Sequence, residues 1–185
     1  MAKTQAQVIR VDDTSTPLAR IVFHFMGGSG SDPKGYEGLS CLMNRLMLRG
    51  TSKLSRSVFE NKVEQMGGTL VPSCSSDSLS IGGSFHRKHT AEWLDLFSEA
   101  LITPRFADSE IERAKRELQA EFDLTMDEDA SLGRLMLKRV LFEGTPYAHS
   151  AIGSPQSIEK IQKDILLEHV RNTYAQSRLL IGCAG

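Results

Sequence analysis

Two strand-like segments in the middle of the chain are separated by only three residues, and this spacing constrains the fold most. The segments 69–74 and 78–85 both read as strands, and Ser75, Ser76 and Asp77 between them form a turn signal. A connection this short joins antiparallel neighbours, because parallel strands need a crossover of a dozen or more residues. The sequence therefore predicts an antiparallel hairpin.

Helical patterns surround the hairpin on both sides. Apolar residues recur at helical spacing in several segments, and Gly50 is a suitable stop for the first of them. Helices are predicted at 38–48, 55–66, 91–101, 108–126, 131–142, 157–163 and 164–174, and further strands at 20–26 and 178–182. Strands and helices alternate irregularly, which favours an α+β fold with a mostly antiparallel sheet.

Composition and charge exclude several classes of partner. The 185 residues are enough for one domain, and the shares of apolar (40%) and charged (24%) residues are those of a soluble globular protein. The net charge is −1, with acids and bases interspersed, so neither nucleic acid nor an anionic membrane is an expected partner. No apolar run approaches the roughly 20 residues of a membrane-spanning helix.

Cysteine usage and the N-terminus bear on the compartment. Cys41, Cys74 and Cys183 are odd in number, widely spaced and outside any C-x-x-C pattern, which argues against a disulfide framework or a cysteine zinc site. Cys74 and Cys183 are predicted to be small buried apolar residues in strands. The segment 1–10 is polar and lacks the apolar region of a secretory signal. A cytoplasmic location is expected, or a periplasmic one if a leader has been removed.

A series of motifs occurs in the order and spacing of one peptidase family. The motifs are GSGSD at 28–32, GLSCLMNR at 38–45, GT at 50–51, QMGG at 65–68, PRF at 104–106, EIER at 110–113, EF at 121–122, GTPY at 144–147 and IG at 152–153. Together they resemble the pitrilysin/insulinase family of zinc peptidases, which includes mitochondrial processing peptidase. The resemblance implies an α+β unit with helices packed on one face of the sheet.

The same resemblance locates the metal site. In intact members two histidines one helical turn apart bind zinc, and the glutamate between them activates the bound water. The matching positions here are Cys41, Asn44 and Arg45, while the distal glutamate ligand corresponds to Glu121. Arginine cannot ligate a metal and asparagine cannot act as a base at neutral pH. The resemblance therefore implies no bound zinc and no catalytic residues.

Two further positions extend this interpretation. The supporting glutamate and asparagine of the family correspond to Ala114 and Val71, so neither supporting group is retained. We expect Arg45 to pair with Glu121 where the metal would lie. A nucleophilic Cys41 activated by Arg45 is an alternative, although the sequence offers no clear general base.

The strand at 69–74 is the expected peptide-binding edge, because active members add a substrate peptide there as another strand. The predicted contact residues are Thr69, Leu70, Val71, Pro72 and Ser73. Pro72 has no N–H to offer, so peptide capture should be weakened or shifted to its neighbours. A proline that merely protects the edge is the alternative interpretation.

The predicted function is that of a non-catalytic unit that positions a peptide and partners an intact zinc-bearing subunit or domain, or a second copy of itself. One alternative is an active metalloendopeptidase with an unorthodox metal site around Cys41 and Glu121. Another is a binding or scaffold module outside proteolysis. Residues 1–185 are expected to form a single N-terminal unit of a longer protein.

Overall fold

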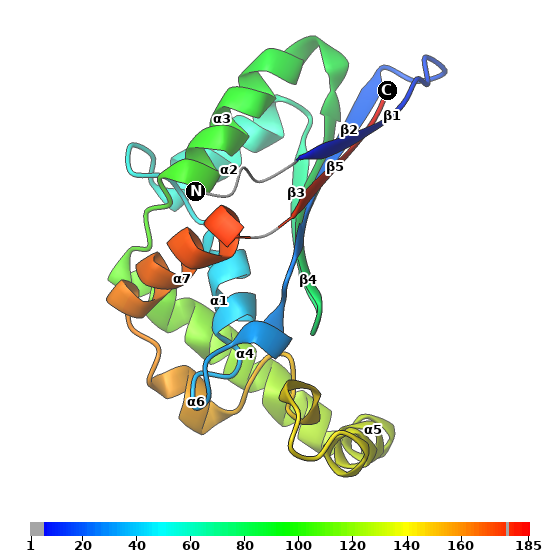
Figure 1. Ribbon diagram of the computed structural model, residues 1–185. Coiled ribbons are helices and arrows are strands. Elements are labelled where there is room, and N and C mark those ends of the chain that lie inside the picture. The colour runs from blue at the N-terminus through cyan, green and yellow to red at the C-terminus, as the bar shows by residue number, and fades with distance from the viewer. Residues whose placement is uncertain (1–5, 177) are drawn as a thin grey trace.

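The computed structural model describes residues 6–176 and 178–185 and contains a five-stranded sheet in the order β1-β5-β2-β4-β3. The strands are β1 (Gln7–Val11), β2 (Leu18–Met26), β3 (Thr69–Cys74), β4 (Ser78–His86) and β5 (Leu179–Ala184). Only the β1–β5 pair is parallel among these strands. The helices cover one face of the sheet (Figure 1). The prediction of an α+β fold with a mostly antiparallel sheet is confirmed.

Each predicted helix is present, with bounds that differ by a few residues. The helices are α1 (Leu39–Leu46), α2 (Arg56–Gln65), α3 (Thr90–Ile102), α4 (Asp108–Asp127), α5 (Asp129–Leu141), α6 (Pro155–Glu159) and α7 (Lys163–Gln176). Helix α1 contacts β3 and β4 on one side and α4 and α7 on others, whereas α5 projects from one end of the molecule (Figure 1). Among the described residues, none of the helices is both long and apolar enough to cross a membrane.

Strand β1 has no counterpart among the predicted strands. It pairs with β5, so Gln7 lies opposite Leu180, and all five of its residues are exposed. A strand without a buried face shows no alternation of apolar and polar residues, which is the signal on which strand prediction depends. Residues 1–5, which belong to the segment considered for a secretory signal, lie outside the described part of the chain.

The face of α2 that enters the core also differs from the prediction. Helical spacing in the sequence predicts that Val58, Val63 and Met66 form this face, but Val58 is 44% exposed in the structure. Phe59 takes its place and is only 1% exposed. Residues 59, 63 and 66 have the spacing i, i+4, i+7, which puts their side chains on one stripe of the helix.

Stacked aromatic rings join the sheet to α3. The ring of Trp93 stacks on Phe85 of β4 at 4.6 Å and on Phe97 at 5.0 Å, and Phe97 stacks in turn on Phe23 of β2 at 4.7 Å. Trp93, Phe85 and Phe97 are each at most 1% exposed. This stack fixes α3 against the centre of the sheet and forms a large part of the core.

The stack gives a test of the core. Phe97→Ala should lower the free energy of unfolding by about 3–5 kcal/mol, because it removes a buried ring and leaves a cavity between two others. The exposed Val58→Ala serves as the control and should change that free energy by no more than about 0.5 kcal/mol. Urea denaturation followed by circular dichroism measures both, and equal effects would contradict this description of the core.

Candidate functional site

The start of α1 is set by the loop that precedes it. Gly38 has φ +96°, and a Cβ there would come within 2.5 Å of the Ile152 carbonyl oxygen. Both carboxylate oxygens of Asp32 accept backbone N–H groups, from Gly38 at 2.8 Å and from Ser40 at 2.9 Å. These bonds satisfy amides at the helix N-terminus that lack intrahelical partners. The GSGSD and GL motifs therefore fix where α1 begins.

A largely buried histidine joins α7 to the same point. His169 Nε2 lies 2.8 Å from Ser40 Oγ and 3.8 Å from Asp32 Oδ1. Burial lowers the pKa of His169 to about 4, so the ring is neutral at pH 7. Burial also raises the pKa of Asp32 to about 6, although its hydrogen bonds with Ser40 and Gly38 act in the opposite direction.

Cys41, at the first metal-ligand position, forms a disulfide with Cys74 of β3. The prediction that Cys74 is a small buried apolar residue is therefore wrong, and the argument against a disulfide framework did not anticipate this single bond. The two residues are 33 apart in sequence, but the packing of α1 under β3 brings their Cα atoms to 5.3 Å. A bonded sulfur offers no thiolate, so Cys41 is neither a metal ligand nor a nucleophile in this state. Cys183 is a free, half-buried thiol.

Asn44, at the general-base position, ties α1 to two strands. Its side chain is 1% exposed, and Nδ2 donates to Ser73 O at 2.8 Å and to Ser80 O at 3.2 Å. A glutamate could not make these bonds, because an ionised carboxylate only accepts. Asn44 Oδ1 is buried without a hydrogen-bond partner among the described residues. The amide at this position therefore acts as a donor within the structure.

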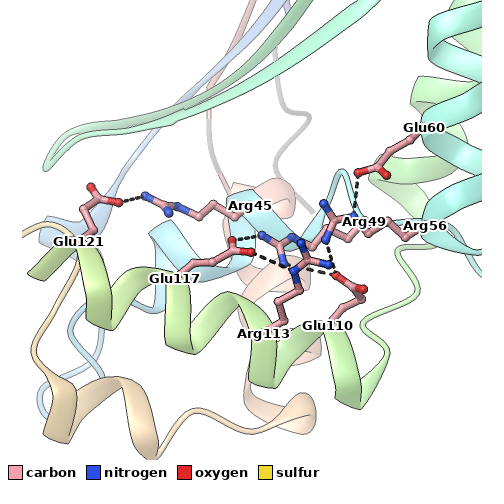
Figure 2. Close-up of polar contacts among 8 residues, drawn as sticks. All are labelled: Arg45, Arg49, Arg56, Glu60, Glu110, Arg113, Glu117 and Glu121. Atoms are coloured by element: carbon pink, nitrogen blue, oxygen red, sulfur yellow. Dashed lines mark hydrogen bonds and ion pairs between the residues drawn. The ribbon is translucent and has the colours of Figure 1, made fainter.

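Arg45, at the second histidine position, pairs with the distal glutamate. Its Nη2 lies 2.5 Å from Glu121 Oε2 on α4, so the predicted ion pair is confirmed (Figure 2). The guanidinium thus engages the carboxylate that would complete a metal site. The side chains are 29% and 47% exposed, so the pair stabilises the fold by only about 1 kcal/mol or less.

A second group of ion pairs continues along α4 from this point (Figure 2). Arg49 pairs with Glu117 and, at 3.3 Å, with Glu110. Arg56 of α2 also reaches Glu110, at 3.0 Å. The network therefore joins α2 and the segment after α1 to α4.

A groove of about 570 Å³ runs between this network and the edge strand β3. Thr69, Leu70 and Pro72 line it, together with Arg45 and Phe59. Val71 and Ser73, the other two predicted peptide contacts, are exposed and are not among the lining residues. The structure thus places three of the five predicted contacts on the groove.

Pro72 occupies a position that faces the free edge of the sheet. The Ser75 amide donates to Ser78 O at 2.9 Å, and amides alternate in direction along a strand. The amide positions of residues 70, 72 and 74 therefore point away from β4, toward any added strand. Pro72 removes the middle one of these donors, as expected for a proline tolerated at a sheet edge.

The residues at the positions that the resemblance assigns to the metal do not fit zinc. Cys41 is in a disulfide, Asn44 donates to carbonyl oxygens, and Arg45 brings a fixed positive charge. Ala114 and Val71, at the two supporting positions, have apolar side chains that can neither ligate nor orient a ligand. Within the described ranges, no group of three or more histidine, cysteine, aspartate and glutamate side chains could hold a metal ion. The fold and the site therefore define a metallopeptidase-type unit whose helix lacks the ligand set.

Comparison with known proteins identifies the family. The family described as Insulinase (Peptidase family M16) matches residues 7–154, and the chain belongs to this family. A non-peptidase homologue, YmxG, of Helicobacter pylori is 27% identical over 99% of the chain. Mitochondrial-processing peptidase subunit beta of Dictyostelium discoideum is 21% identical over 96% of the chain. The chain spans 42% and 38% of the lengths of these two relatives.

A solved structure has the same fold. The peptidase M16 inactive domain from Pseudomonas fluorescens superposes with a TM-score of 0.92 at 23% sequence identity, covering 99% of this chain and 45% of that chain. The fold is therefore that of an M16 unit.

The donor role of Asn44 generates one prediction. Asn44→Asp should lower the free energy of unfolding at pH 7 by about 2–4 kcal/mol, because a buried carboxylate would face two carbonyl oxygens. The loss relative to the wild-type protein should shrink as the pH falls and the new carboxyl becomes protonated. Urea denaturation at pH 7 and pH 5 measures this. A variant as stable as the wild-type protein would contradict the assigned hydrogen bonds.

The largely buried side chain of His169 leads to a second prediction, on the pH dependence of stability. The pKa of His169 is about 4 in the folded chain, below its ordinary value, so the unfolded chain binds the proton first as the pH falls. The free energy of unfolding of the wild-type protein, relative to His169→Gln, should fall by about 2–3 kcal/mol between pH 7 and pH 4. The raised pKa of Asp32 changes the free energy of unfolding in the opposite direction as the pH falls. Both proteins contain Asp32, so its contribution largely cancels in the difference between them. A pH-independent difference would refute the burial argument.

Proposed function

We propose that this chain is a non-catalytic M16 unit that positions a peptide for a catalytically intact unit or subunit of the same family. The supporting observation is that the positions of the metal centre are occupied by internal links. Cys41 is bonded to Cys74, Asn44 donates to Ser73 O, and Arg45 pairs with Glu121. Two of these links engage Cys41 and Glu121, the groups among them that could otherwise ligate zinc.

The same links argue against an active centre built from Cys41 and Glu121. The sulfur of Cys41 is covalently occupied, and Glu121 already has a cationic partner. An isolated carboxylate paired with an arginine provides neither a Lewis acid nor an activated water. The proposal therefore assigns binding and assembly to this chain, with zinc predicted absent and chemistry supplied elsewhere.

Peptide positioning is supported by the edge of the sheet. The groove beside β3 has apolar walls from Phe59, Val63 and Leu70 and charged walls from Arg45 and Glu117. The outward amides of Leu70 and Cys74 remain available for pairing with an extended peptide, since only the position of Pro72 lacks its donor. We assign weak peptide capture to this edge through residues 69–73.

The intact partner is supported by the relatives. Mitochondrial-processing peptidase occurs among them as both its alpha and its beta subunit, from different organisms. The chain covers less than half the length of these relatives, so the partner unit could belong to the same polypeptide or to a second one. A homodimer is the remaining arrangement, and the experiment below separates it from the others.

The test is co-expression of the full chain with an intact M16 protein of the same genome, followed by light scattering and peptide-cleavage assays. The chain alone should cleave no peptide, and it should co-elute with the intact protein and raise the rate at which that protein cleaves an unstructured peptide. Cleavage by the chain alone that is abolished by a chelator would overturn the proposal. So would a chain that elutes unchanged and leaves the partner's rate unaltered.

The proline at the edge provides a separate prediction. Pro72→Val should strengthen the binding of an extended fluorescent peptide by about three- to tenfold, because it restores the missing outward donor and thus one net hydrogen bond. Fluorescence anisotropy measures the dissociation constant. Pro33→Ala, outside the strands, is the matched control and should leave it unchanged. Unchanged binding by Pro72→Val would mean that peptides do not pair with this edge.

A further inference from the structure

The Cys41–Cys74 disulfide joins the helix of the lost metal site to the free edge of the sheet. We propose that it is a reversible redox site, at which a dithiol reductant releases the edge strand β3 from α1. The metal-site analysis does not require such a link, because Asn44 and Arg45 by themselves remove the base and a ligand.

The position of the disulfide makes it able to control β3. The strand is at the end of the sheet, so β4 is its only strand neighbour among the described residues. Its inner-face residues, Leu70, Pro72 and Cys74, are half-buried, and Cys74 is the last residue of the strand. The disulfide therefore holds the end of β3 next to the hairpin turn, where the Asn44–Ser73 hydrogen bond is the neighbouring tie to α1.

The two sulfurs are unequal in access and in surroundings. Cys41 is 2% exposed, whereas Cys74 is half-buried at the sheet edge, so an incoming thiolate meets Cys74 first. Cys41 is the third residue of α1 and lies beneath the strand. Because Cys74 Sγ is the sulfur that is attacked, Cys41 is the leaving group of the exchange.

The exchange is balanced with a dithiol as the reductant. One thiolate of the dithiol attacks Cys74 Sγ, the Sγ–Sγ bond breaks, and Cys41 leaves as a thiolate that takes up a proton. The second thiol of the reductant then attacks the mixed disulfide and releases Cys74 as a thiol. The protein gains two electrons and two protons, and the dithiol becomes a disulfide.

Reduction should loosen β3 locally. Local opening is governed by the contacts that hold a segment, and an edge strand with one strand neighbour has few. The amides of Thr69, Val71, Ser73 and Ser75 face β4 and report on this opening, as the Ser75–Ser78 bond indicates. Strands β2 and β5 lie inside the sheet and should remain protected.

The experiment is hydrogen–deuterium exchange of the full chain with and without dithiothreitol. Reduction should speed exchange in residues 69–75 by about tenfold or more, while β2 and β5 change by less than about twofold. Alkylation before reduction should label Cys183 alone, and alkylation after reduction should label all three cysteines. With a monothiol reductant, the mixed disulfide should be found on Cys74.

Two variants provide the controls. Cys183→Ser should respond to dithiothreitol as the wild-type protein does. The double variant Cys41→Ser/Cys74→Ser should exchange rapidly in β3 with no response, and reduction of the wild-type protein gives the same information if that variant does not fold. Three alkylated cysteines before reduction, unchanged exchange in β3, or equal acceleration in every strand would each overturn the proposal. Peptide binding enters none of these readouts, so they are independent of the proposed function.

Discussion

The packing of α1 between the sheet and α4 is the constraint on which the site depends. The resemblance to the family implies that in an intact member a zinc ion, shared by two histidines and the distal glutamate, would join this helix to α4. Here the join is made by other means, through Cys41 to β3, Asn44 to β3 and β4, and Arg45 to α4. The helix thus keeps the same neighbours without the ion.

The three links differ in strength, and the differences indicate what each one does. The disulfide is covalent, and the amide of Asn44 is buried, so both oppose separation of α1 from the strands. The Arg45–Glu121 pair is partly exposed and contributes little stability. Its consequence is electrostatic, since the guanidinium of Arg45 places a fixed positive charge beside the carboxylate of Glu121.

The sequence predicts the features whose signals lie within a few residues of one another, and it misses features that depend on contacts between distant segments. Helices and the hairpin were predicted because their periodicity and turn residues lie within a few positions of one another. Strand β1 was not, because its parallel pairing with β5 joins opposite ends of the chain. The Arg45–Glu121 pair could be predicted from the family frame, since both positions are named by it. The Cys41–Cys74 bond could not, because only the packing of α1 under β3 brings these cysteines together.

The central claim is that the positions which the resemblance assigns to the metal centre form internal links in this chain and bind no zinc. The most direct test is the zinc content of the purified full chain, measured by elemental analysis after chelation and re-addition of zinc, with an intact family member treated in parallel. The account predicts less than about one-tenth of an equivalent for this chain, since a structural or catalytic site would retain about one. Near one equivalent, lost on Glu121→Ala, would contradict it.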